Sequence, residues 1–163
     1  MKKMGLVFLV TISVYWLFGA TARSDSRCHA QGTAPFTAPD NGCTPGAFVH
    51  KTKADVCDGK TERPRLPSAE ERFIERSYGF AVFTGSTGEL DHRIPLVFGG
   101  TTDRRNIWPE VGSRPNPKDR LEDLLYRRVC TGVPHRMRLS TAIRIFQADW
   151  RPAYTRYVQR IGP

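Results

Sequence analysis

Acidic residues, long apolar runs and closely spaced cysteines are all scarce in this chain of 163 residues. Its 16 Asp and Glu stand against 25 Lys and Arg, so a disordered acidic tail is excluded. Only one long apolar run occurs, which excludes a protein with several membrane-spanning helices. The length leaves room for one modest hydrophobic core and therefore excludes a multidomain enzyme. What remains is one small catalytic or binding domain with a formal net charge of +9.

The single apolar run lies near the start of the chain and predicts an export signal. Two lysines precede the uncharged run 5–20, and residues 20–22 have the A-x-A pattern of a cleavage site. We therefore assign residues 1–22 to a signal peptide and expect an exported protein, periplasmic or secreted. An uncleaved membrane anchor is the alternative, because the run approaches the roughly 20 apolar residues that span a bilayer.

The four cysteines have no C-x-x-C spacing, which argues against a zinc knuckle. Thiols pair in an oxidising compartment, so an even set in an exported protein predicts two disulfides. Three pairings can be drawn. We favour Cys28 with Cys43, which closes a short loop rich in Pro and Gly, and Cys57 with Cys130, which ties the early part of the chain to a later helix. Four buried free thiols are the alternative.

Composition divides the remaining chain into two parts. Residues 23–67 are rich in Gly, Pro, Thr and Asp and carry no sustained apolar period, so we expect a loop-rich, disulfide-stapled segment. Residues 68–163 carry the apolar periods of a folded domain. No internal repeat is present in either part.

The domain is expected to begin with a helix and two strands. Residues 68–71 have the form of a capping box, which predicts a helix from Ser68 that ends near Gly79. Strands are predicted at 80–83 and 90–98, with turn-forming residues between them.

Two further helices complete the prediction. Asn116 suits a helix cap, Pro117 suits the first helical position, and Gly132 ends the apolar stripe that follows them. A last helix begins at Ser140 and is kinked or restarted at Pro152. The sequence therefore predicts an α+β fold with a small antiparallel sheet.

Side chains suited to phosphodiester chemistry gather between residues 89 and 119. Asp91 and His92 place a hard-cation ligand beside a general base, and Asn106 and Asn116 follow at loop and helix positions. Mg²⁺ prefers oxygen ligands and needs few protein groups, while histidine titrates near neutrality and can deprotonate a water. These residue types suit a phosphodiesterase that depends on Mg²⁺ or Mn²⁺.

In this order the residues resemble the HNH, or ββα-metal, endonuclease motif. The resemblance rests on Asp91-His92-x-x-Pro95-Leu96, the Gly99-Gly100 turn, Asn106-x-Trp108-Pro109 and Asn116-x-Lys118. The run 89–150 is similar to a group of exported bacterial HNH-type proteins, and the similarity extends to Thr44-Pro45-Gly46-Ala47 and Cys57. It implies a two-stranded antiparallel sheet plus a helix, with flanking helices around them.

The resemblance also implies a role for each motif residue. His92 matches the general base that activates the attacking water, and Asn106 matches the residue that holds the loop and orients this base. Asp91 and Asn116 match the two ligands of a single divalent metal ion. Asn116 stands where the motif often has histidine, and an oxygen ligand there favours Mg²⁺ or Mn²⁺ over Zn²⁺.

The expected substrate is DNA, with RNA as an alternative, cut with little sequence specificity because no sequence-reading module is recognisable. Trp108 and Trp150 are expected to pack in the core and not to stack on bases. Basic side chains near the motif are expected to bind flanking phosphates, since guanidinium groups match phosphate geometry. The candidates are Arg93, Arg104, Arg105, Arg114, Lys118, Arg120, Arg127 and Arg128.

Two other functions are consistent with the sequence. A noncatalytic module on a decayed HNH scaffold would bind nucleic acid or another polyanion through its positive charge. A disulfide-stapled interaction protein, such as an inhibitor of another exported enzyme, would need neither metal nor nucleic acid. Dependence on a divalent metal separates the endonuclease from both.

Overall fold

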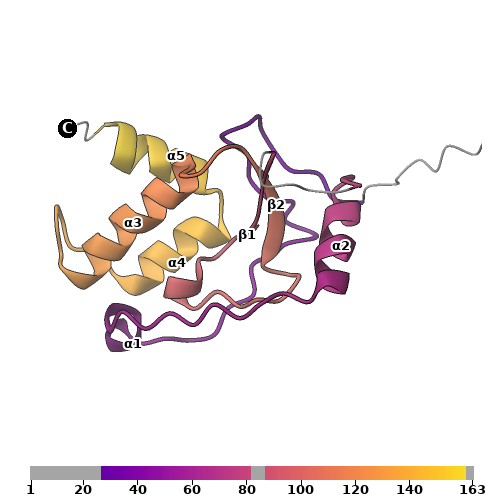
Figure 1. The fold of residues 1–163 in the computed structure, drawn as a ribbon. Coiled ribbons are helices and arrows are strands. Elements are labelled where there is room, and N and C mark those ends of the chain that lie inside the picture. The colour runs from indigo at the N-terminus through magenta and orange to yellow at the C-terminus, as the bar shows by residue number, and fades with distance from the viewer. Residues whose placement is uncertain (1–26, 82–86, 161–163) are drawn as a thin grey trace, which may run out of the picture.

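The computed structural model describes residues 27–81 and 87–160 (Figure 1). The predicted signal peptide at 1–22 and the second half of the predicted strand 80–83 lie outside the described residues. None of the described helices is long and apolar enough to cross a membrane. The helices are α1 (Lys53–Cys57), α2 (Ser68–Ser77), α3 (Pro117–Cys130), α4 (Leu139–Gln147) and α5 (Trp150–Tyr154), the last continuing into a π-helical turn at Thr155–Gln159. The strands are β1 (Gly88–His92) and β2 (Ile107–Val111).

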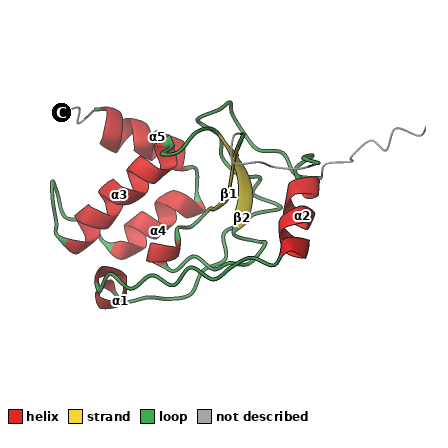
Figure 2. Ribbon diagram, in the orientation of Figure 1, coloured by secondary structure: helices red, strands yellow, loops and turns green. Residues whose placement is uncertain are grey.

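The two strands form an antiparallel sheet at the centre of the molecule, which confirms the predicted α+β class. Helices α3, α4 and α5 lie together on one side of the sheet in Figure 1, and α2 lies on the other side against β2. Figure 2 shows that the segment before α2 is mostly loop, as its composition predicts, with only α1 as a short helix. Helix α1 packs against α3.

The predicted strand 90–98 overlaps β1 at residues 90–92 only, and the described half of the predicted strand 80–83 is not a strand. Phe80 and Ala81 form no strand, and β1 ends at His92, where the chain turns into a short 3₁₀ helix at Leu96–Phe98. The partner of β1 is β2, whose Pro109 and Glu110 weaken any strand signal in the sequence. A two-stranded sheet consists of edge strands, and an edge strand tolerates proline.

The helix signals near residue 116 are confirmed. Asn116 caps α3, because its Oδ1 accepts a hydrogen bond from the Asp119 amide at 3.0 Å. The Asp119 carboxylate in turn accepts from the Asn116 amide at 2.8 Å, which completes a capping box. Pro117 is the first helical residue, and Gly132 follows the helix with a φ of +81°.

The other helices differ in detail from the prediction. Helix α2 begins at Ser68, but the expected capping box is absent from its first turn, since Pro67 is the capping residue and no side chain caps the helix. The last helix is interrupted three residues before Pro152, where Asp149 caps α5. Pro152 thereby lies in the first turn of α5. Backbone N–H groups there make no hydrogen bond within the helix, so the missing N–H of proline costs nothing.

The hydrophobic core lies between the three late helices and the loop that follows β1. One face of α3 contributes an apolar stripe, and α4, α5 and the loop cover it. Trp108 and Trp150 are both buried, as expected. The largest of its completely buried members are Ile94, Phe98, Leu121, Leu125, Phe146 and Trp150.

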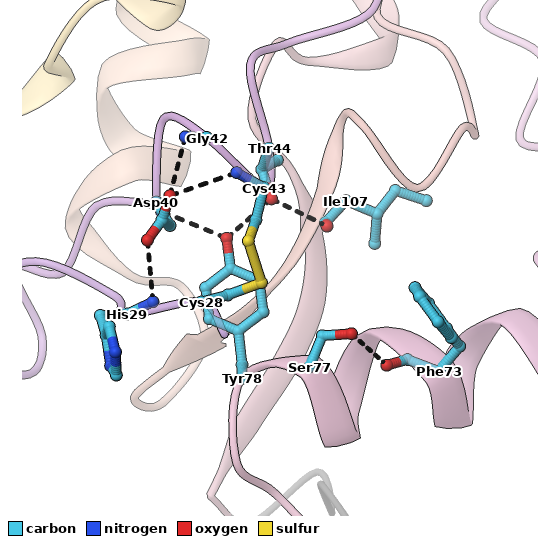
Figure 3. The surroundings of a disulfide bond; sticks show 10 residues. All are labelled: Cys28, His29, Asp40, Gly42, Cys43, Thr44, Phe73, Ser77, Tyr78 and Ile107. Atoms are coloured by element: carbon cyan, nitrogen blue, oxygen red, sulfur yellow. Dashed lines mark hydrogen bonds between the residues drawn. A yellow bond between two sulfur atoms is a disulfide. The ribbon is translucent and has the colours of Figure 1, made fainter. Parts of the chain in front are cut away.

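Both favoured disulfides are present in the structure, Cys28–Cys43 and Cys57–Cys130. Around the first bond, the Asp40 carboxylate accepts hydrogen bonds from the backbone amides of His29 at 3.0 Å and Gly42 at 2.7 Å (Figure 3). The second bond ties the end of α1 to the end of α3. The loop-rich segment is therefore fastened to the domain by covalent bonds as well as by packing.

Loop length predicts an order for the two disulfide contributions. Replacing Cys57 and Cys130 by serine should lower the free energy of unfolding by about 4 kcal/mol, against about 3 kcal/mol for Cys28 and Cys43, since longer loops lose more entropy on closure. The sequence separations are 73 and 15 residues. Urea unfolding of the two double variants beside the wild type measures both values. A larger loss for the shorter loop would contradict the expectation.

Candidate functional site

A cleft of about 730 Å³ opens at the end of β1. Its walls come from β1, from one face of α3 and from residues 59–64 of the loop-rich segment. Acidic side chains outnumber basic ones in this lining, although the protein as a whole carries excess positive charge. The charged and titratable residues of the lining are Arg63, Glu89, Asp91, His92, Arg114, Asp119, Glu122, Asp123 and Tyr126.

The strand register explains why several carboxyl groups meet here. Glu89 lies opposite Glu110, and Asp91 lies opposite Trp108. Directly opposed residues of an antiparallel pair share one face of the sheet, and so do alternate residues of one strand. Glu89, Asp91 and Glu110 therefore project from the same face. Lys118, the second residue of α3, reaches the same carboxyl cluster.

Lys118 and Asp91 form a buried ion pair. The Lys118 Nζ donates to Asp91 Oδ2 at 2.5 Å, and the Lys118 side chain is only 1% exposed. Burial alone disfavours the charge on Asp91, yet the adjacent ammonium holds the pKa of Asp91 below its ordinary value. Burial likewise opposes the charge on Lys118, but Asp91 and Glu110 outweigh it and raise the pKa of Lys118. Both partners stay charged at neutral pH.

Glu110 lies deep beside this pair. Its side chain is 1% exposed, and neither carboxyl oxygen accepts a hydrogen bond from any residue between 27 and 81 or between 87 and 160. Burial, followed by the charge of Asp91, raises the pKa of Glu110 to about 9. Glu122 has a milder form of the same environment, because burial and the charge of Asp91 raise its pKa to about 7. The site therefore holds more carboxyl groups than Lys118 can neutralise.

His92 stands at the wall of the cleft with a hydrogen bond to one ring nitrogen. Its Nε2 lies 3.2 Å from Thr102 Oγ1, whose hydroxyl donates to the Pro64 carbonyl at 3.5 Å. Donation by Thr102 to Pro64 leaves its oxygen free to accept from Nε2–H, and in this tautomer Nδ1 is unprotonated. Burial lowers the pKa of His92, and the positive charges of Lys118 and Arg63 add to this effect against the opposing charge of Asp91. The imidazole is therefore neutral at pH 7 and able to accept a proton.

Asn106 ties together the loop behind His92. Its Oδ1 accepts from the Ile94 amide at 2.9 Å, and its Nδ2 donates to the carbonyls of Ile94 and Thr101 at 3.0 Å. The approach is so close that a Cβ on Gly100 would lie 1.7 Å from the Ile94 carbonyl oxygen, so only glycine fits there. The side chain holds the loop as the resemblance implies.

The structure gives Arg93, Lys118 and Arg128 buried positions, which leave no surface for a phosphate. The Arg93 guanidinium donates to backbone carbonyls on the Thr44 and α4 sides, including Thr44 O at 2.5 Å. Arg128 donates to the His135 carbonyl and lies over the Tyr157 ring. These three residues drop out of the expected phosphate contacts.

The remaining basic candidates are exposed. Arg104 lies over the Phe73 ring, Arg105 pairs with Asp103, and Arg114 pairs with Glu89 at the rim of the cleft. Arg120 and Arg127 lie on the outer face of α3, away from the acidic face that lines the cleft. Arg63, which sequence reasoning missed, lines the cleft from the opposite wall.

The predicted metal ligands are not arranged as a complete metal site. Among residues 27–81 and 87–160, no three or more His, Cys, Asp and Glu side chains form a group that could hold a metal ion. Asn116 uses its Oδ1 in the cap of α3, although an amide oxygen retains a second lone pair. Mg²⁺ usually keeps several waters and needs only one or two carboxylates. The orphaned oxygens of Glu110 beside Asp91 fit such an ion, because carboxyl oxygens are the donors that Mg²⁺ prefers.

Comparison of the chain with protein-family models, with curated proteins and with solved structures found no match.

Replacing Asn106 with alanine should destabilise the protein by roughly 3 kcal/mol or more, because it leaves buried groups of Ile94 and Thr101 without partners. Chemical denaturation of this variant measures the loss. Asn41→Ala is a matched control, since Asn41 is exposed. Equal stability of the two variants would show that the clamp contributes nothing.

The pKa of His92 should be lower than 6.5 when measured by NMR titration, because burial disfavours the charged ring. The fold then favours the neutral form, and the free energy of unfolding falls as the pH drops through the unfolded-state value near 6.5. Comparison with the spectrum of His135→Ala identifies the signals of His135, so that they are not mistaken for those of His92. A His92 pKa above 6.5 would contradict the expected environment.

Proposed function

We propose that the protein is an exported, divalent-metal-dependent endonuclease that hydrolyses phosphodiester bonds of DNA with little sequence specificity. The observation that carries the proposal is a neutral His92 at the wall of an open cleft, beside Asp91 and backed by the Asn106 clamp. The succession of β1, β2 and α3 is the order that a ββα-metal motif requires, and it supports the same proposal. The two disulfides agree with folding in an oxidising compartment.

His92 is the general base in this mechanism. The hydrogen bond from Nε2–H to Thr102 fixes the ring and leaves Nδ1 to take a proton from the attacking water. Asn106 acts indirectly, by holding the loop that follows the strand carrying His92. Asp91 is the proposed metal ligand and Asn116 the proposed second one. The Mg²⁺ or Mn²⁺ ion supplies stabilisation of negative charge on the phosphate and the leaving oxygen.

The charge of the cleft explains why such an enzyme would depend on a cation. The excess of basic over acidic residues attracts a polyanion from a distance, but the acidic lining of the cleft repels a phosphate at short range. A phosphodiester therefore approaches His92 favourably only when a cation offsets the carboxylates. The exposed Arg104, Arg105, Arg120 and Arg127 are the proposed contacts to phosphates outside the cleft.

One observation favours a second candidate, a noncatalytic module that binds nucleic acid or another polyanion. Lys118 already neutralises Asp91, so the protein's own ammonium sits on the proposed metal ligand. A scaffold that has lost its metal would keep the basic surface and bind polyanions with strong salt dependence.

Plasmid and RNA digestion by the disulfide-bonded protein separates these candidates. We expect cutting with Mg²⁺ or Mn²⁺, none with EDTA, and a loss of roughly 100-fold or more in His92→Ala, in line with removal of a general base. His135→Ala is the matched control, because that side chain is exposed and outside the cleft. Salt-sensitive DNA binding without cutting in any metal would reject the endonuclease in favour of the binding module.

A further inference from the structure

The carboxyl groups of Asp91 and Glu110 meet on one face of the sheet. The register places Asp91 opposite Trp108, two residues before Glu110 on β2, so the two acidic side chains are diagonal neighbours across the strands. The two groups also interact electrostatically, because the charge of Asp91 acts on the Glu110 carboxyl group. Only 1% of Glu110 is exposed. Bulk water therefore does not screen Glu110 from the Asp91–Lys118 pair, as it would for carboxylates on the surface.

Two ionised carboxylates cannot satisfy one another, because each is only an acceptor. Their contact becomes favourable when a proton or a cation lies between them. Lys118 meets this need for Asp91 alone: its Nζ contacts Asp91 Oδ2, while both Glu110 oxygens lack a donor among the described residues. An unpartnered, buried side chain thus points into a cluster that already attracts one cation.

We propose that Glu110 is a ligand of the divalent cation, together with Asp91. This inference rests on the proposed function for the presence of the ion, and it adds a residue that the HNH resemblance does not supply. The two carboxylates provide hard oxygen donors, and waters complete the shell of an ion such as Mg²⁺ or Mn²⁺. Glu110 therefore has a binding role, and a metal ligand is expected to lack a donor to its oxygens, as Glu110 does among the described residues.

The competing explanation is a shared proton, in which Glu110 is a neutral acid that donates to Asp91. Glu110→Gln distinguishes the two. The glutamine amide still donates to Asp91 and fills the same volume, so a proton-sharing role survives the change. A ligand role does not, because the negative charge is lost.

Mn²⁺ binding to the disulfide-bonded protein, followed by electron paramagnetic resonance, tests the proposal without any reaction. We expect Glu110→Gln to weaken Mn²⁺ binding by roughly tenfold or more, a loss of the size seen when the surroundings of a metal are altered. Glu70→Gln on α2 is the matched control and should bind as the wild type does. Unchanged Mn²⁺ affinity in Glu110→Gln, with native circular dichroism, would overturn the proposal.

Terbium luminescence gives a second measurement of where the ion binds, and it needs no substitution of Asp91 or Glu110. Trp108 lies directly across the strands from Asp91, so Tb³⁺ bound at this face should luminesce when indole is excited. Mg²⁺ should displace it, and Trp108→Phe should remove the signal while Trp150→Phe keeps it. Absence of sensitised luminescence in the wild type would count against an ion on this face.

The two proposals fail in different ways. If Glu110→Gln loses Mn²⁺ binding and the wild type cuts no nucleic acid, the metal site stands and the endonuclease falls. If the wild type cuts DNA with Mn²⁺ and Glu110→Gln binds Mn²⁺ normally, the endonuclease stands and the role of Glu110 falls.

Discussion

The ion pair between Lys118 and Asp91 joins helix α3 to strand β1, and the shape of the cleft depends on it. Two charges removed from water cost several kcal/mol unless they meet each other in good geometry, and loss of one partner typically costs about 3–5 kcal/mol. The pair therefore tolerates little change in the separation of strand and helix. The same contact determines where His92 stands relative to the acidic face of α3.

The parts of the fold that follow from local chemistry were predictable from the sequence. The cap at Asn116, the proline after it and the glycine beyond α3 act within one or two turns of helix, and the structure contains all three. The position of β2 was not predictable in this way. Its proline and glutamate read as loop residues, and it is a strand because β1 pairs with it across a loop of fourteen residues that Asn106 ties together.

In the candidate site, too, local features were predictable from the sequence and tertiary contacts were not. Asp91 and His92 are neighbours in the chain, so their proximity needed no tertiary information. Arg93 follows them directly, yet its side chain is buried and donates to backbone carbonyls of Phe146 and Thr44. Those carbonyls come from distant parts of the chain, so the sequence near Arg93 does not predict its burial. The sequence did not predict a role for Glu110, because the charges that act on it come from Asp91 on β1 and Lys118 on α3. No spacing along the sequence connects these three residues.

One wall of the cleft belongs to the loop-rich segment, immediately after the cysteine that is bonded to the end of α3. The Thr102 hydroxyl contacts both the Pro64 carbonyl of that wall and the Nε2 atom of His92. The Cys57–Cys130 bond is thus connected to the surroundings of His92 through one short stretch of chain and two hydrogen bonds. Formation of this disulfide restrains one wall of the cleft, so we expect the shape of the cleft to depend on oxidation of the two thiols.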